Sequence, residues 1–330
     1  MLIKFFKSSF IIQYFFLVLV TAALWIPGFL ANGGLPVEPS IITPFYNMEH
    51  WLLKLWEPAS PAAAVAIVFV SALTLNNILI FHDLTPKNNI LPAFIFILLM
   101  GSNPHALCSY PYLLALPFFT WFLHTIYKMN DEPENYMEVF NASILVSVIS
   151  MIYPVAIVLF LFIWMTMLVY GIFNGRNLII SILAVVLPYV YLFLYFFWTD
   201  QIPAALEAYR NYFGEIFGFK MNKEAIQLVI WSIFAVFMLL PAFMRISGTL
   251  SSFNINFRKK MSATTWLMVF SLPIIVLHGS VNYNNLILLP AGIMIAHYYQ
   301  LFKKSLMNEI GLLVLLILIF INNYLYFFNA

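Results

Sequence analysis

Residues 31–61 have the sequence ANGGLPVEPSIITPFYNMEHWLLKLWEPASP and form the first long break in an otherwise apolar chain. The segment holds Glu38, Glu49, His50, Lys54 and Glu57, a high density of ionisable groups for this sequence. Apolar runs flank it on both sides, and each is about as long as a helix that crosses a bilayer. The pattern predicts a polar loop outside a membrane, between two helices that span it.

The composition of the whole chain indicates that lipid is its main solvent. Hydrophobic residues make up 63% of the 330 residues and charged residues only 8%, whereas soluble domains carry about 25% charged residues. So few charges cannot cover a water-facing surface. The basic residues lie between apolar runs, where membrane orientation explains them, so we expect no nucleic-acid partner. The single cysteine, Cys108, excludes an internal disulfide and a multi-cysteine metal site.

Apolar runs repeat along the chain and predict an all-α, polytopic bundle of about 11 transmembrane helices in a single domain, residues 1–330. The first run is too long for a signal peptide and no small-residue cleavage site follows it, so we expect a retained helix. The expected spans are about 10–30, 62–81, 90–101, 111–127, two within 139–173, 178–198, 225–243, 263–277, 286–301 and 310–328.

The run 139–173 is longer than one crossing and leaves two alternatives. A break at Tyr153-Pro154 gives two spans with almost no loop, because proline disfavours helical geometry in the residue before it and has no backbone donor. One kinked and strongly tilted helix is the alternative, and it would invert the topology of everything downstream.

The distribution of basic residues favours the break and sets the orientation. With the N-terminus inside, the outer segments contain only Lys54, Arg210, Lys220 and Lys223. The inner segments contain the others: Lys4, Lys7, Lys87, Lys128, Arg176, Arg245, Arg258, Lys259, Lys260, Lys303 and Lys304. This asymmetry agrees with the positive-inside rule.

Two long outer loops, residues 31–61 and 199–224, each contain an amphipathic pattern. In the first loop, Met48, Trp51, Leu52 and Leu55 recur at helical spacing, and in the second loop Leu206, Tyr209, Phe213 and Ile216 do so. Polar residues lie on the other faces. Both patterns predict helices that lie in the membrane interface, although these helices could simply seal the end of the bundle.

The placement of these loops, after the first and seventh spans, resembles the GT-C class of membrane glycosyltransferases. The acids Glu38 and Glu49 and the bases Arg210, Lys220 and Lys223 carry this resemblance. The first acid after the first span is Glu38, whereas enzymes of this class usually carry an acid close to the span end. Two further stretches, 75–104 and 136–170, resemble an uncharacterised family of bacterial polytopic membrane proteins, which implies the bacterial inner membrane.

The GT-C resemblance implies transfer of a sugar from a polyprenyl-phosphate carrier to an acceptor on the outer face. Glu49 or Glu38 is then the candidate base, with His50 assisting, because the acceptor hydroxyl must lose a proton. Arg210, Lys220 and Lys223 are candidates for holding the lipid phosphate. The implied partners are the lipid-linked sugar and bilayer lipids.

No cofactor is expected, apart from a possible divalent metal at the acidic stretch 130–138, whose charges are more often simply solvated. Two other function classes stay open. A lipid or glycolipid transporter is one, although no Asp, Glu, Lys or Arg lies clearly within a span. A non-catalytic subunit of a larger membrane complex, with membrane protein partners, is the other.

Overall fold

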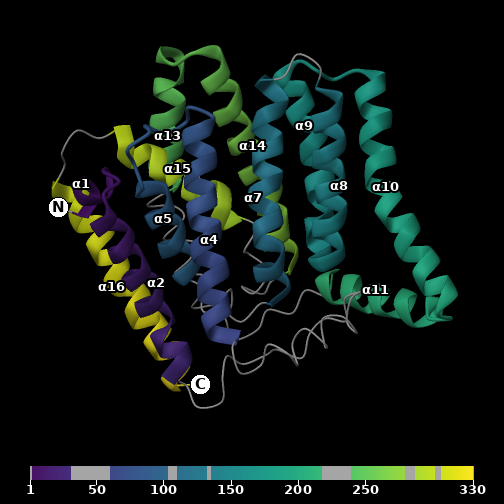
Figure 1. The fold of residues 1–330 in the computed structure, drawn as a ribbon, viewed down its shortest axis with the longest axis horizontal. Helices are drawn as coiled ribbons and strands as arrows, with labels where there is room; N and C mark the ends of the chain where they lie inside the picture. The colour runs from purple at the N-terminus through teal and green to yellow at the C-terminus, as the bar shows by residue number, and fades with distance from the viewer. Residues whose placement is uncertain are drawn as a thin grey trace.

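The computed structural model describes residues 2–30, 60–102, 110–131, 135–217, 239–278, 287–301 and 306–329. Within these ranges every regular element is a helix, which confirms the all-α prediction (Figure 1). The α-helices are α1 Leu2–Phe6, α2 Ile11–Leu30, α4 Ser60–Phe81, α5 Leu91–Gly101, α7 Tyr110–Asp131, α8 Tyr136–Ile152, α9 Leu159–Tyr170, α10 Gly175–Trp198, α11 Ile202–Phe217, α13 Leu240–Thr249, α14 Ile255–His278, α15 Leu288–Leu301 and α16 Leu306–Asn329.

Two of these helices are long and apolar enough to cross a bilayer by themselves. They are α4, over Ala64–Phe81, and α10, over its whole length. Several shorter apolar helices accompany them, among them α5, α8 and the segment Pro154–Tyr170. This agrees with a membrane protein, while the number of spans stays a prediction.

The centre of the bundle is formed by α5 and α15, which pack against each other. All 11 residues of α5 are buried. The short span expected at 90–101 is therefore a helix that other helices surround. Helix α4 packs on α5, and α2 and α16 also pack against α5. A helix that is apolar on all faces is stable in the core of a protein or in lipid, and α5 lies in the core.

The C-terminal end of α5 is a close junction of three helices. A Cβ atom on Gly101 would lie 2.7 Å from the Leu24 side chain, so α2 approaches only because this residue is glycine. The buried Asn323 side chain on α16 donates hydrogen bonds to the carbonyls of Gly101 (2.8 Å) and Leu24 (3.3 Å). It thereby joins α2, α5 and α16, as interhelical amides do in membranes.

The chain reverses direction at Tyr153-Pro154. Helix α8 ends at Ile152, and a short 3₁₀ helix, Pro154–Val158, leads into α9. Asn177 at the start of α10 donates a hydrogen bond (3.1 Å) to Asn135 at the start of α8, so both residues lie at the same end of the bundle. A single kinked helix would place them at opposite ends, and the two-helix alternative is the one that the structure contains.

The bundle has two distinct ends. We call one the basic end: here the last turns of α4, α7 and α9 meet the first turns of α8, α10 and α14. The other is the α11 end, where α11 lies across the bundle after α10 (Figure 1). The second amphipathic helix predicted from sequence is therefore confirmed as a helix, while the one expected at 48–55 lies outside the described residues.

Two expected loops at the basic end prove to be partly helical. Helix α7 continues to Asp131, beyond the expected end at Tyr127, and α14 begins at Ile255, ahead of the basic triplet 258–260. The sequence prediction ended these helices where apolar residues ended. Lysine and arginine are good helix formers, however, and no proline or glycine separates them from the apolar turns.

Candidate functional site

Four ionisable side chains, from two helices and from the turn after a third, meet at the basic end. His82 directly follows α4, His124 and Asp131 lie on α7, and Lys260 lies on α14. We call these four residues the basic-end cluster. Asp83, with a φ of 56°, turns the chain at the end of α4, a left-handed conformation that aspartate tolerates better than most residues.

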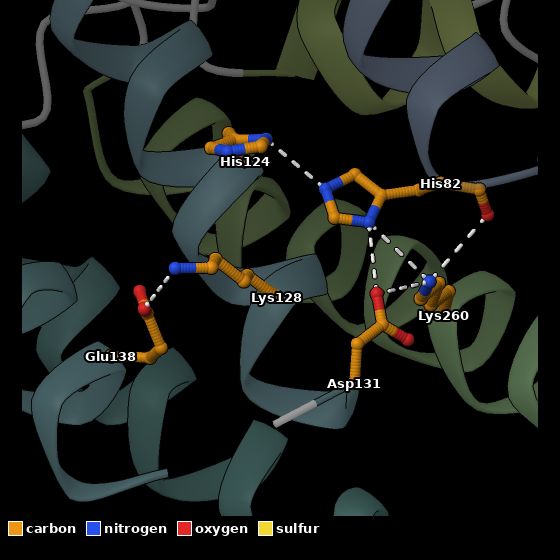
Figure 2. Close-up of polar contacts among 6 residues, drawn as sticks. All are labelled: His82, His124, Lys128, Asp131, Glu138 and Lys260. Carbon is orange, nitrogen blue, oxygen red and sulfur yellow. Dashed lines mark hydrogen bonds and ion pairs between the residues drawn. The ribbon is translucent and has the colours of Figure 1, made fainter.

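His82 lies at the middle of the cluster (Figure 2). Its Nδ1 atom is 3.1 Å from Asp131 Oδ2, and its Nε2 atom is 3.1 Å from His124 Nδ1. Lys260 Nζ donates to Asp131 Oδ2 at 2.8 Å and to the His82 carbonyl at 3.5 Å. Lys260 Nζ, which only donates, also lies 3.4 Å from His82 Nδ1. Because Asp131 is closer and a carboxylate only accepts hydrogen bonds, we assign the His82 proton to Nδ1, and Nε2 then accepts from His124.

Burial differs sharply between the two charged members of the cluster. The Lys260 side chain is 5% exposed, whereas the Asp131 side chain is 35% exposed. A buried ammonium group is unfavourable without a counter-charge. Asp131 therefore neutralises Lys260 and also orients the His82 ring. The resulting chain Asp131–His82–His124 can pass a proton between its ends through the imidazole ring.

The basic-end cluster holds His82 neutral at neutral pH. Burial, and after it the Lys260 charge, lowers the pKa of His82 from 6.5 to about 4 against the opposing effect of Asp131. The folded protein thus binds this proton more weakly than the unfolded chain. Between pH 6.5 and about 4 the unfolded state holds more protons, so stability falls as the pH falls through this window.

We expect the free energy of unfolding to fall by about 2 kcal/mol between pH 7.5 and 5 through His82 alone. The check is unfolding in detergent micelles at both pH values, for the wild type and for His82→Asn. Asparagine keeps a donor near the Nδ1 position but does not titrate, so this variant should lose less stability on acidification. An equal loss in both proteins would contradict the assignment.

A second ion pair joins α7 to α8 near the cluster. Lys128 Nζ lies 2.7 Å from Glu138 Oε1, and the Glu138 side chain is buried. The acidic stretch 130–138 thus places Asp131 and Glu138 against different lysines rather than around a common point. Among the residues that the structure describes, no group of three or more His, Cys, Asp or Glu side chains is arranged for a metal ion.

A cavity of about 640 Å³ lies beside the basic-end cluster. His82, Asp131 and Lys260 form part of its wall. The rest comes from the turn 83–87 after α4, the first turn of α14 and the last turn of α15. Its volume lies within the range of about 300–1,000 Å³ that is typical of small-molecule sites.

Of the six site residues predicted from sequence, the structure describes one, Arg210. Arg210 lies on α11, at the opposite end of the bundle, and its side chain is exposed. Glu38, Glu49, His50, Lys220 and Lys223 lie outside the described residues. The predicted grouping of the six therefore stays a prediction.

The sequence prediction missed the basic-end cluster. It treated Lys260 as a topology signal and Asp131 as part of a solvated acidic stretch. One signal was present: His124, Lys128 and Asp131 recur at i, i+4 and i+7, and this spacing places all three on one face of a helix.

Comparison of the chain with models of known protein families, with curated proteins and with solved structures finds no match. The function is therefore inferred from the chain itself.

Proposed function

We propose that the protein is a GT-C-like glycosyltransferase of the bacterial inner membrane, with about 11 spans and its N-terminus inside. It moves a sugar from a polyprenyl-phosphate carrier to an acceptor on the outer face. In this orientation the basic end is cytoplasmic and the α11 end is outside. The observation that carries the proposal is α11, an amphipathic helix that lies across the outer end directly after α10.

The orientation is supported by the positions of the described basic residues. Lys7 donates to the Gln300 carbonyl, Arg176 lies over the Tyr136 ring, and Lys259 donates to the Tyr170 carbonyl. All three contacts are at the basic end. Arg210 is at the other end, which fits the positive-inside rule with the basic end in the cytoplasm.

The second half of α10 supports contact with a lipid. Up to Pro188 the helix packs on α8, where Ser147 donates to the Val185 carbonyl and Ser150 is 2.8 Å from the Tyr189 hydroxyl. Large apolar side chains are exposed along the whole helix. Before Pro188 they include Ile179, Leu183 and Val186, and beyond it they are Val190, Tyr191, Phe193, Leu194, Tyr195, Phe197 and Trp198. A polyprenyl tail lying along this half would bring its phosphate to α11 and Arg210.

The proposed step is a displacement at the anomeric carbon. The acceptor hydroxyl oxygen forms a bond to that carbon while the bond from the carbon to the phosphate oxygen breaks. Glu49 or Glu38 takes the hydroxyl proton, and polyprenyl phosphate leaves with its electron pair. Arg210, with Lys220 and Lys223, stabilises the negative charge on the departing phosphate.

Deletion of the gene in its host, followed by complementation, tests the proposal. We expect the deletion to remove one envelope glycan and to accumulate its lipid-linked sugar. The wild type should restore the glycan fully and Arg210→Ala about tenfold less efficiently, since a charge-assisted hydrogen bond contributes about 1.5–3 kcal/mol. Arg210→Lys, which keeps the charge, is the control. An unchanged glycan profile in the deletion strain would refute the proposal.

The chain Asp131–His82–His124 favours one other candidate, a proton-coupled lipid transporter, because transporters use such relays. The purified protein in nanodiscs separates the two. A nanodisc has no separate compartments, so a transporter would leave the lipid-linked sugar unchanged there, while an enzyme would consume it.

A further inference from the structure

The first turn of α14 faces the cavity beside the basic-end cluster. Asn254, Asn256 and Phe257 line the cavity wall at this point. The first hydrogen bond of the helix is donated by Arg258 to the Asn254 carbonyl at 3.0 Å, so the backbone N–H groups before Arg258 have no acceptor within the helix. The 24-residue helix also presents the positive end of its dipole here.

The charges around this helix terminus add to the positive potential. The first turn of α14 carries no acidic residue, and Arg258, Lys259 and Lys260 follow it. Cations near a helix N-terminus are unfavourable in the absence of an anion. Lys87 lines the cavity from the α4–α5 turn, together with Asp83. Asp131, the other acid in the wall, is already bound to Lys260.

The wall of the same cavity contains buried polar atoms that have no hydrogen-bond partner among the described residues. The clearest is Thr85 Oγ1, in a residue that is 8% exposed. Leaving such an atom unpaired costs about 1–3 kcal/mol. The α4–α5 turn thus supplies unused hydrogen-bonding capacity to the wall.

An apolar surface adjoins these polar groups. The rings of Phe253 and Phe257 stack with centroids 4.4 Å apart, and the His297 ring centroid lies 5.1 Å from that of Phe257. The cavity therefore combines an anion-binding helix terminus and hydrogen-bonding groups with an aromatic wall. Such a combination suits a molecule with an anionic group on a larger, partly apolar body.

We propose that this cavity binds a phosphate group carried by a larger molecule, with the phosphate at the first turn of α14 and the rest of the molecule against Phe253 and Phe257. Phosphates bind at helix N-termini through backbone N–H groups and the helix dipole. The phosphate belongs either to a phospholipid headgroup or to a soluble phosphorylated compound. The site lies at the opposite end of the bundle from α11, so it is independent of the proposed sugar transfer.

The test uses the full-length protein in neutral detergent and two probes, inorganic phosphate and short-chain phosphatidylglycerol. A ligand that binds only the folded state raises the unfolding temperature in a saturable way. We expect one or both probes to do so for the wild type. A response to phosphatidylglycerol alone identifies a lipid headgroup, and a response to inorganic phosphate as well identifies a site open to soluble phosphates.

The key variant is Asn256→Asp, which adds a negative charge in the first turn of α14. Acidic residues stabilise helices at this position, so the variant should fold at least as well as the wild type. It should nevertheless bind the probe about tenfold more weakly or worse, because like charges a few ångströms apart repel each other.

The matched control is Asn88→Asp, the same substitution at an exposed residue of the α4–α5 turn that does not line the cavity. It should bind like the wild type. The proposal is overturned if neither probe raises the unfolding temperature of the wild type. It is also overturned if Asn256→Asp and Asn88→Asp change the response equally, since the anion would then bind elsewhere.

Discussion

Replacing Asp131 by alanine is expected to lower the free energy of unfolding by about 3 kcal/mol or more. The reason is the unequal burial of the ion pair that Asp131 forms with Lys260. Lys260 is 5% exposed and its Nζ atom is 2.8 Å from the carboxylate. Without Asp131 its charge stays buried beside two neutral groups of His82, the ring Nδ1 at 3.4 Å and the backbone carbonyl at 3.5 Å, and has no counter-charge there. Equilibrium unfolding in mixed micelles measures the effect.

The double variant Asp131→Ala, Lys260→Met is the matched control. Methionine fills a similar volume without the charge, and replacing a buried ion pair by apolar groups is often neutral or stabilising. The double variant should therefore recover most of the stability that Asp131→Ala loses. The single variant Lys260→Met should cost less than Asp131→Ala, because Asp131 is 35% exposed and water can solvate it. Equal stability of Asp131→Ala and the wild type would contradict the structural role.

The second large effect concerns the proposed base. If Glu49 or Glu38 takes the proton from the acceptor, replacing that residue by glutamine should slow sugar transfer by about 10²–10⁴-fold. The substitution keeps the shape of the side chain and removes only its basicity. We expect the other single variant to retain most of the rate and the double variant to be inactive. Consumption of the lipid-linked sugar by the purified protein, followed by mass spectrometry, gives the rates.

Glu57→Gln is the control for these variants. Glu57 lies three residues after Lys54, a spacing that is typical of a solvated ion pair on a helix surface, so the transfer rate should stay near that of the wild type. Full activity of the double variant Glu38→Gln, Glu49→Gln would exclude both acids as the base. If Glu57→Gln alone were inactive, the base would be Glu57.

Local sequence patterns were sufficient to predict most of the helices. Apolar runs located α2, α4, α5 and α10, and the amphipathic spacing of Leu206, Tyr209 and Phe213 located α11. The break at Tyr153-Pro154 was also visible, because proline limits the conformation of its neighbour wherever it occurs. These features depend on the residue itself and on neighbours within about two helical turns, which the sequence shows directly.

The sequence by itself thus determined an all-helical, apolar chain and the helix that follows α10, and it favoured the reversal at Tyr153-Pro154 over a single kinked helix. Only the tertiary structure decided that Lys260 is buried against Asp131 and that His82 joins Asp131 to His124. These partners are 129, 49 and 42 residues apart in the chain. No periodicity links such distant positions: they meet because the packing of α4, α7 and α14 brings their ends together, and a buried charge is stable only where packing supplies its counter-charge.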